Sequence, residues 1–533
     1  DSKRICVLLL ASLLGVASAV HFTRSEAEAV AKTFPQNLEQ FYELQEPHLN
    51  PGQSTSKNVS QNLTTGYLNV NQSSSSAMFF QFYKCRSLGS TLNQNTDPSK
   101  VPIVIWLAGG PGWSSIIGNY FEMGPETIEY NASSGEYYTQ RRNVSWNDFY
   151  HMLFIDQPIG TGYSYLNSSN EVPQSSVKVA LQFLTGLLNF YNLTDMAPFA
   201  QNPLYIFGSS YAGHYIPPIA KAILEWNEGT DVNIPLAGIG IASGLVDLQN
   251  QIVTYGLFGY SMALIDSVEK ENIEAEILSA FYNMNNAKQT LKTKGLTAAL
   301  PFFDAASQNL EVIVNTIKNT SGNINLNNFR EFGDYNFTNI VNYVNSSTTR
   351  DLWGVPANMS FSPLSLAVHL ALMRWDSMIS YADDVAFVLN RTRVLLSAGQ
   401  DDWYVNTAGI LEWIGKMQWD GNADFYNAEH QNWMLNDKTT HAGYAQSAKN
   451  LTFVLVNKAG HLAAKDQIEA TTEMVRRFIE GVEDWTNNTA QTIQDLPKPV
   501  FNFEIPTKEY FEQQRRLQLQ SLDEKVILSS DLQ

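Results

Sequence analysis

Cysteine is scarce in this chain. Its 533 residues include two cysteines, Cys6 and Cys85. Cys6 lies in an N-terminal apolar run that we interpret as a cleaved signal, which leaves Cys85 as the single thiol of the mature chain. An intramolecular disulfide is therefore excluded, and the fold must depend on a hydrophobic core, which this length permits. We expect Cys85 to be a buried structural thiol, with an intermolecular bridge as the alternative.

Positive charge is also in short supply. Lys and Arg number 34 against 52 Asp and Glu, a net charge of -18. Phosphate backbones and anionic membrane surfaces repel such a chain, so we expect no nucleic-acid partner. Charged residues make up only 16% of the chain and hydrophobic ones 44%, which indicates a packed globular protein rather than a disordered one.

Long hydrophobic runs are missing, and the longest candidate lies at the N-terminus. Lys3 and Arg4 precede an apolar run from Ile5 to Val16, followed by the small residues 17–19. This run is shorter than the roughly 20 residues that span a bilayer. We therefore predict a signal peptide at 1–19 and no membrane span; a buried N-terminal helix is the alternative.

Sequons for N-glycosylation support the same compartment. The chain holds fourteen: Asn58, Asn62, Asn71, Asn131, Asn143, Asn167, Asn192, Asn319, Asn336, Asn345, Asn358, Asn390, Asn450 and Asn487. Each sequon alone is weak evidence, because an Asn- and Ser-rich chain contains some sequons by chance. Together with a signal peptide they predict a glycoprotein of the secretory pathway, either secreted or resident in a lysosome or vacuole.

Short apolar runs alternate with helical periodicity along most of the chain. A hairpin is predicted from residues 67–70 and 77–83, and buried strands at 101–107, 152–155, 204–207, 237–241, 393–397 and 451–456. Strands alternating with helices predict an α/β sheet, with its core at 64–249 and 386–481. Residues 250–385 read as a mostly helical cap insertion, 20–63 as an N-terminal segment and candidate pro-segment, and 482–533 as a polar C-terminal tail.

A nucleophile motif follows one of these strands. Residues 208–213 spell Gly-Ser-Ser-Tyr-Ala-Gly, which follows G-x-S-x-G centred on Ser210 except that Ala212 stands at the second glycine position. The pattern is common, and a Ser/Gly turn without chemistry is the alternative. Here an apolar strand precedes it and a helical pattern follows, which is the context that exposes a serine hydroxyl on a sharp turn.

A serine hydroxyl needs a base and an orienting acid, expected later in the chain in the order Ser, Asp, His. The strand ending at Ser397 leads to Asp401 and Asp402, either of which could be the acid. Of the later histidines, His430 and His441 lie in polar surroundings typical of solvated loops. His461 directly follows a strand and a small-residue turn, which is the position expected of the base.

An oxyanion hole needs main-chain N–H groups that no side chain obstructs. The Gly-Gly-Pro-Gly turn at 109–112 follows the strand at 101–107. Such a turn is more often structural, but beside the other two motifs it favours catalysis. We expect the donors to be the N–H groups of Gly110 and Tyr211.

Together these segments resemble the serine carboxypeptidase family. The resemblance runs from about residue 66 to 481 and rests on several long motifs in order: Trp-Leu-Ala-Gly-Gly-Pro-Gly-Trp-Ser-Ser from Trp106, Phe-Glu-Met-Gly-Pro from Phe121, the 154–165 segment, Gly-Ser-Ser-Tyr-Ala-Gly-His-Tyr from Gly208, and Ala-Gly-His from Ala459. It implies an α/β-hydrolase fold, with a central mostly parallel sheet and a helical insertion. It also implies the nucleophile Ser210, the base His461, the acid Asp402, and the oxyanion donors Gly110 and Tyr211.

The family's site for the substrate's terminal carboxylate is altered. The resemblance assigns this site to Trp106, Gly109, Glu122 and Ser209. Ala108 stands where the family has Asn, and Ser209 where it has a second Glu. Each lost hydrogen bond to a buried carboxylate costs on the order of 1–3 kcal/mol. Trp113 stands where the family has a small residue or cysteine, Ala463 and Ala464 replace a Val-Pro pair, and the family's disulfides are absent.

Three functions compete. The first is a serine carboxypeptidase acting on peptides with a free C-terminus; the second is an esterase or acyltransferase with the same machinery, motivated by the altered carboxylate site. A non-enzymatic secreted binding protein is the third and weakest, because a complete triad would then have no use. The histidines are scattered and no nucleotide loop is found, so no metal and no cofactor is predicted. The sequence leaves a homodimer open.

Overall fold

The fold is described from a computed structural model that places residues 49–90, 93, 95–437 and 439–486. The predicted signal peptide, residues 20–48 of the N-terminal segment and residues 487–533 of the tail lie outside these described residues. Among the described residues, no helix combines the length and the apolar character that crossing a membrane requires.

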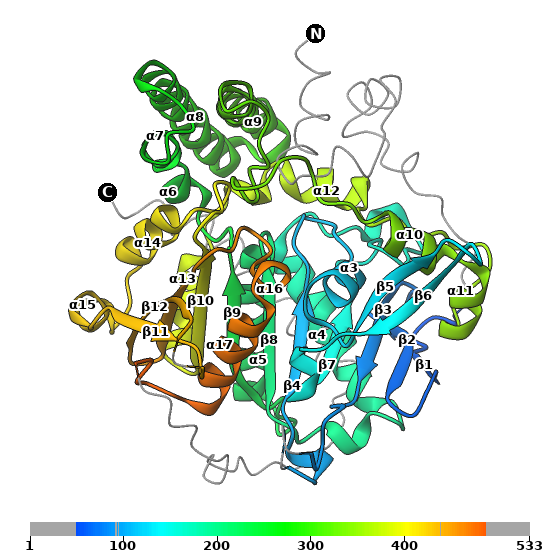
Figure 1. The fold of residues 1–533 in the computed structure, drawn as a ribbon. Coiled ribbons are helices and arrows are strands. Elements are labelled where there is room, and N and C mark those ends of the chain that lie inside the picture. Colours follow the sequence, from blue (N-terminus) through cyan, green and yellow to red (C-terminus); the bar gives the residue numbers. More distant parts are fainter. Residues whose placement is uncertain (1–48, 91–92, 94, 438, 487–533) are drawn as a thin grey trace.

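One large twisted sheet organises the molecule (Figure 1). Its strand order is β1-β2-β3-β7-β4-β8-β9-β10-β13-β12-β11. The strands from β7 to β13 in this order run parallel, and antiparallel strands flank them at both edges. Their bounds are β1 Thr55–Asn58, β2 Leu63–Asn69, β3 Ala77–Tyr83, β4 Ile103–Leu107, β7 His151–Ile155, β8 Leu204–Ser209, β9 Leu236–Ala242, β10 Arg393–Gly399, β11 Gln431–Met434, β12 His441–Ala448 and β13 Leu451–Val456.

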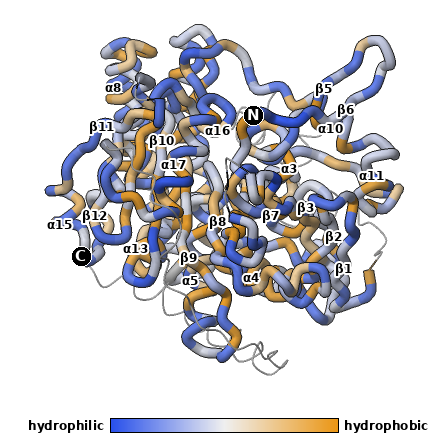
Figure 2. Tube along the Cα trace, turned by 60° about the horizontal axis from the view of Figure 1, so that its bottom comes forward, coloured by the Kyte–Doolittle hydropathy of each residue, from blue (hydrophilic) through white to orange (hydrophobic). Residues whose placement is uncertain are grey.

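The central strands are apolar on both faces because helices cover both faces. In β4, Ile103, Ile105 and Leu107 face one core and Val104 and Trp106 face the other. The first core contains α4 (Ser176–Asn192) and α5 (Ala212–Gly229), and the second contains α17 (Ile468–Glu480). Figure 2 shows hydrophobic residues concentrated in this interior and hydrophilic ones recurring around the periphery. The α/β sheet predicted from these runs is confirmed, and its mostly parallel order is that of the α/β-hydrolase fold that the resemblance implies.

The segment between β9 and β10 is helical. Its helices are α6 Leu248–Ile252, α7 Tyr255–Ser261, α8 Ser267–Lys294, α9 Leu296–Thr320, α10 Thr338–Asn345, α11 Ser347–Trp353, α12 Leu366–Met373, the 3-10 turn η7 Asp376–Met378 and α13 Ala382–Leu389. Helices α8 and α9 pack as a pair beyond one end of the sheet, at the top of Figure 1. Helix α13 instead packs on α5 and β10, so it belongs to the layer covering the sheet.

Several polar strands were not predicted. A separate hairpin, β5 (Glu126–Asn131) and β6 (Glu136–Arg141), lies beside α10. Strand β1 comes from the predicted N-terminal segment and pairs with β2 at the edge of the sheet. Four further helices follow β10 and β13 or join the edge strands: α14 Thr407–Lys416, α15 Asn422–Asn427, α16 Ala463–Asp466 and α17.

The single described cysteine is buried, as predicted. Cys85 is 5% exposed and makes no disulfide. Its Sγ contacts the main-chain oxygen of Asp148 at 3.4 Å. Burial raises the pKa of the thiol, which keeps it protonated and unreactive. The structural interpretation of Cys85 therefore holds.

Candidate active site

Ser210 lies on a sharp turn between β8 and α5. Its φ of 63° is in the left-handed region, which side chains other than glycine rarely adopt. Main-chain hydrogen bonds hold it there: its N–H donates to the oxygen of Ala242 at 3.1 Å, and its oxygen accepts from the N–H of Leu245 at 2.9 Å.

The Gly-Gly-Pro-Gly turn lies directly against this serine. A Cβ added to Gly109 would lie 2.5 Å from the nitrogen of Tyr211 and 2.7 Å from the Cβ of Ser210. Gly110 has a φ of 113°, which also favours glycine. The two segments predicted to supply oxyanion donors are therefore adjacent, and glycine is required for that approach.

His461 and Asp402 are hydrogen bonded to each other. Nδ1 of His461 lies 2.7 Å from Oδ2 of Asp402, whose Oδ1 accepts the N–H of Val405 at 3.0 Å. The carboxylate is fully buried and the imidazole is 5% exposed. The other ring nitrogen, Nε2, is buried and has no hydrogen-bond partner among the described residues. It is thus available to a group outside this pair.

The alternative acid and bases lie elsewhere. Asp401 binds Arg330 at 3.2 Å rather than a histidine. His430 is exposed and stacks on Tyr444, and His441 contacts the side chain of Asn457. Of the candidates, only Asp402 and His461 come together.

Three of the four predicted carboxylate-binding residues line a small cavity beside His461. Trp106, Glu122, Ser209 and His461 all line it, and its volume of about 20 Å³ corresponds to roughly one water molecule. Gly109, the fourth, is not among the residues that line the cavity and lies against Ser210. The Nε1 of Trp106 is buried without a hydrogen-bond partner in the described residues. Trp106 therefore has an unused donor, and its side chain and that of Glu122 line the same cavity.

Glu122 is held as a neutral acid. Desolvation raises its pKa to about 8; the charge of Asp466 also raises it, and Arg142 opposes the shift. The side chain is 4% exposed. Below that pH the protonated carboxyl can donate a hydrogen bond to an anion, which an ionised one cannot.

A cluster of aromatic rings beside Glu122 was missed by sequence reasoning. Phe337 from the helical insertion packs against Phe121 at 4.8 Å and Trp113 at 5.2 Å between ring centroids. Tyr335 packs against Phe121 at 5.7 Å, and its buried hydroxyl has no hydrogen-bond partner in the described part of the chain. Trp113 and Phe121 belong to the motifs that carry the family resemblance, but no spacing in the sequence connects them to residues 335 and 337.

Comparisons with known proteins show the family to which the chain belongs. The family model described as serine carboxypeptidase matches residues 51–481. Serine carboxypeptidase S10 family member 1 of Dictyostelium discoideum is 29% identical over 424 residues, covering 78% of this chain and 94% of that protein. Serine carboxypeptidase-like 50 of Arabidopsis thaliana is 30% identical over 417 residues, covering 78% and 87%.

A solved structure shares the fold. It is that of Kex1Δp, a prohormone-processing carboxypeptidase from Saccharomyces cerevisiae, with a TM-score of 0.65 and 22% identity. The match covers 79% of this chain and 92% of that one. With the family model matching most of its length, the chain belongs to the serine carboxypeptidase family of hydrolases.

Proposed function

We propose that this protein is a secreted or lysosome-like serine carboxypeptidase that releases C-terminal residues from peptides through an acyl-enzyme on Ser210. The observation that carries the proposal is the buried hydrogen bond of 2.7 Å between His461 Nδ1 and Asp402 Oδ2. It leaves Nε2 of the same imidazole free to act on the serine.

In this mechanism His461 takes the proton of the Ser210 hydroxyl as Oγ bonds to the scissile carbonyl carbon. The N–H groups of Gly110 and Tyr211 stabilise the negative oxygen of the tetrahedral intermediate. The carbon–nitrogen bond then breaks, and His461 gives its proton to the leaving amino group. Water repeats the sequence on the acyl-enzyme, while Asp402 holds the imidazole in orientation and stabilises its positive charge.

The substrate's terminal carboxylate would bind at the cavity formed by Trp106, Glu122 and Ser209. Neutral Glu122 and the indole of Trp106 each supply a hydrogen-bond donor, and the Ser209 hydroxyl supplies a third. A charge-assisted hydrogen bond contributes more than a neutral one, about 1.5–3 kcal/mol. These donors would select substrates that end in a free carboxylate.

One observation favours a second function, ester hydrolysis or acyl transfer. Ala108 has no side-chain donor, and Ser209 is shorter than the Glu that the resemblance implies at its position. A weakened carboxylate site would leave the triad able to act on substrates without a free C-terminus. The same triad and oxyanion hole would serve this reaction.

The secretory pathway is the proposed location. Eleven of the sequon asparagines are exposed and so accessible to a glycan: Asn58, Asn62, Asn71, Asn131, Asn143, Asn167, Asn192, Asn319, Asn336, Asn358 and Asn390. Asn345 and Asn450 are half-buried, and Asn487 lies outside the described residues. Intact-mass measurement before and after glycosidase treatment tests this proposal.

The proposed activity is tested with one blocked dipeptide as its free acid, its C-terminal amide and its ester, from acidic to neutral pH. We expect rapid hydrolysis of the free acid, abolished in Ser210→Ala. Turnover of the ester or amide but not of the acid would support the second function instead. Absence of any turnover, together with no labelling of Ser210 by a fluorophosphonate, would favour a binding protein.

A further inference from the structure

A buried carboxylate lies behind the nucleophile turn and takes no part in the triad. Asp376, in the turn η7, is fully buried. Its Oδ1 accepts the N–H of Ser176 at 3.0 Å and the hydroxyl of Tyr381 at 2.7 Å. Its Oδ2 accepts the hydroxyls of Ser176 at 2.5 Å and Tyr211 at 2.9 Å.

These four donors explain why the carboxylate can be buried. A buried charge is costly unless hydrogen bonds replace its water. Ser176 is the first residue of α4, so its N–H also brings the favourable end of a helix dipole. Asp376 is therefore a fixed, fully hydrogen-bonded acceptor that joins three separate segments: the starts of α4 and α5, and the turn before α13.

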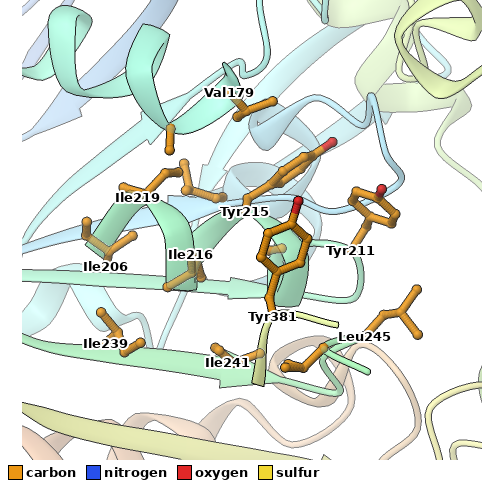
Figure 3. Packing of buried hydrophobic residues seen from close by; sticks show 14 of the residues in the cluster. Val179, Ile206, Tyr211, Tyr215, Ile216, Ile219, Ile239, Ile241, Leu245 and Tyr381 are labelled. Atoms are coloured by element: carbon orange, nitrogen blue, oxygen red, sulfur yellow. The ribbon is translucent and has the colours of Figure 1, made fainter. Parts of the chain in front are cut away.

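One of its donors is the residue next to the nucleophile. The ring of Tyr211 is 1% exposed, stacks on His214 at 4.6 Å and meets Tyr215 edge-on at 5.2 Å. His214 is itself fixed through Nδ1 to the main-chain oxygen of Leu245 at 2.5 Å. Figure 3 shows the rings of Tyr211, Tyr215 and Tyr381 together, with their hydroxyl groups on the same side. The hydrogen bond to Asp376 fixes the far end of the Tyr211 ring, and the stacked ring of His214 and the edge-on ring of Tyr215 fix its plane.

Fixing this ring bears on the reaction because Tyr211 supplies a main-chain N–H beside Ser210. Ser210 has a φ of 63°, a conformation that costs on the order of 1–3 kcal/mol and persists only where the surroundings enforce it. Movement of Tyr211 would turn its N–H away from the forming oxyanion and relax the serine. Misplacement by about 1 Å can cost on the order of 100-fold in rate.

We propose that Asp376 is a positioning residue, which acts through the Tyr211 hydroxyl to hold the Tyr211 N–H and Ser210 in their reactive arrangement. This inference rests on the proposed role of Ser210 as nucleophile. It assigns to Asp376 a contribution to kcat rather than to substrate binding, because Asp376 is fully buried beneath the turn.

The test compares Tyr211→Phe with Tyr163→Phe. The first removes only the hydroxyl bound to Asp376. The second removes an equally buried tyrosine hydroxyl that donates to the oxygen of Val344 at 2.8 Å, away from the nucleophile. We expect Tyr211→Phe to lower kcat about tenfold with KM within twofold, and Tyr163→Phe to change only the thermal midpoint. Asp376→Asn should lower kcat at least as much as Tyr211→Phe.

The rate at which a fluorophosphonate labels Ser210 gives a second readout that needs no peptide substrate. Slower labelling of Tyr211→Phe than of Tyr163→Phe is expected. Equal rates for both variants and the wild type would overturn the inference, as would a change confined to KM. If wild-type Ser210 is labelled but no peptide is hydrolysed, the peptidase proposal fails while the comparison of labelling rates still stands. No labelling of wild-type Ser210 would overturn both.

Discussion

The main-chain N–H of His461 donates a hydrogen bond to the main-chain oxygen of Asn327 at 2.6 Å. Asn327 belongs to the helical insertion, in the segment between α9 and α10. In the same segment the N–H of Phe329 donates to the oxygen of Asp401 at 3.0 Å, and the side chain of Asn328 donates to Asp466 at 3.0 Å. The insertion thus contacts both loops of the His461–Asp402 pair, and its integrity should affect their alignment.

Gly460→Ala should break this contact. A Cβ at Gly460 would lie 2.2 Å from the Asn327 oxygen and 2.5 Å from the Cβ of Asn328, so main chain would have to move. Because the next residue is His461, we expect kcat to fall at least about tenfold. Gly415→Ala is the control, since its added Cβ would meet only the end of the Tyr426 side chain at 3.3 Å. Steady-state kinetics of both variants check this, and full activity of Gly460→Ala would contradict it.

Substitutions of the two neighbouring acids, Asp401 and Asp402, should have very different effects on kcat. Asp402→Asn removes the charge that orients His461, and comparable substitutions in serine proteases lower kcat by about 10⁴. Asp401→Asn breaks only an ion pair with Arg330, whose side chain is 54% exposed, so we expect less than a tenfold change. The measurement is kcat for each variant on the free-acid dipeptide. Comparable losses of kcat in both variants would contradict the assignment of Asp402 as the acid that orients His461.

The central strands could be predicted because their burial on both faces leaves a continuous apolar run. Strand β4 (Ile103–Leu107) is an example, with every residue buried. Strands at the edges carry no such signal: β6 reads Glu-Tyr-Tyr-Thr-Gln-Arg and is largely exposed, and β1 is polar. Their pairing depends on neighbours that lie outside their own local sequence pattern.

The same limit applies to the candidate site. Ser210 and His461 follow strands, so the order of the chain indicates them, whereas Asp401 and Asp402 both follow β10 and residue spacing cannot separate them. The hydrogen bonds of Asn327 and Asp376 join segments far apart in the chain. The sequence around each residue does not indicate its role, because that role depends on hydrogen bonds to distant segments.

Ser209→Ala tests the altered carboxylate site. The Ser209 side chain is 5% exposed and lines the cavity with Trp106 and Glu122. Loss of one hydrogen bond to a carboxylate should raise KM for the free-acid dipeptide by about one to two orders of magnitude. The matching ester lacks that charge, so its KM should change less than twofold. An equal change for the acid and the ester would show that Ser209 does not recognise the carboxylate.

Glu122→Gln should change how both stability and activity depend on pH. Desolvation raises the pKa of Glu122 from 4.5 to about 8, so the folded protein keeps this proton after the unfolded chain has lost it. Between about pH 4.5 and 8 stability should therefore fall as pH rises, with a contribution on the order of a few kcal/mol. The neutral amide of Gln does not titrate, so the thermal midpoint of the variant should fall less over that range.

The same substitution predicts a change in KM. In the wild type, ionisation of Glu122 near pH 8 places a negative charge beside the bound carboxylate, so KM for the free acid should rise there. In Glu122→Gln the amide still donates a hydrogen bond, and KM should stay level through this range. Glu136→Gln, at an exposed position on β6, is the control and should behave as the wild type does. Parallel pH profiles for Glu122→Gln and the wild type, in both melting and KM, would show that this carboxyl is not the titrating group.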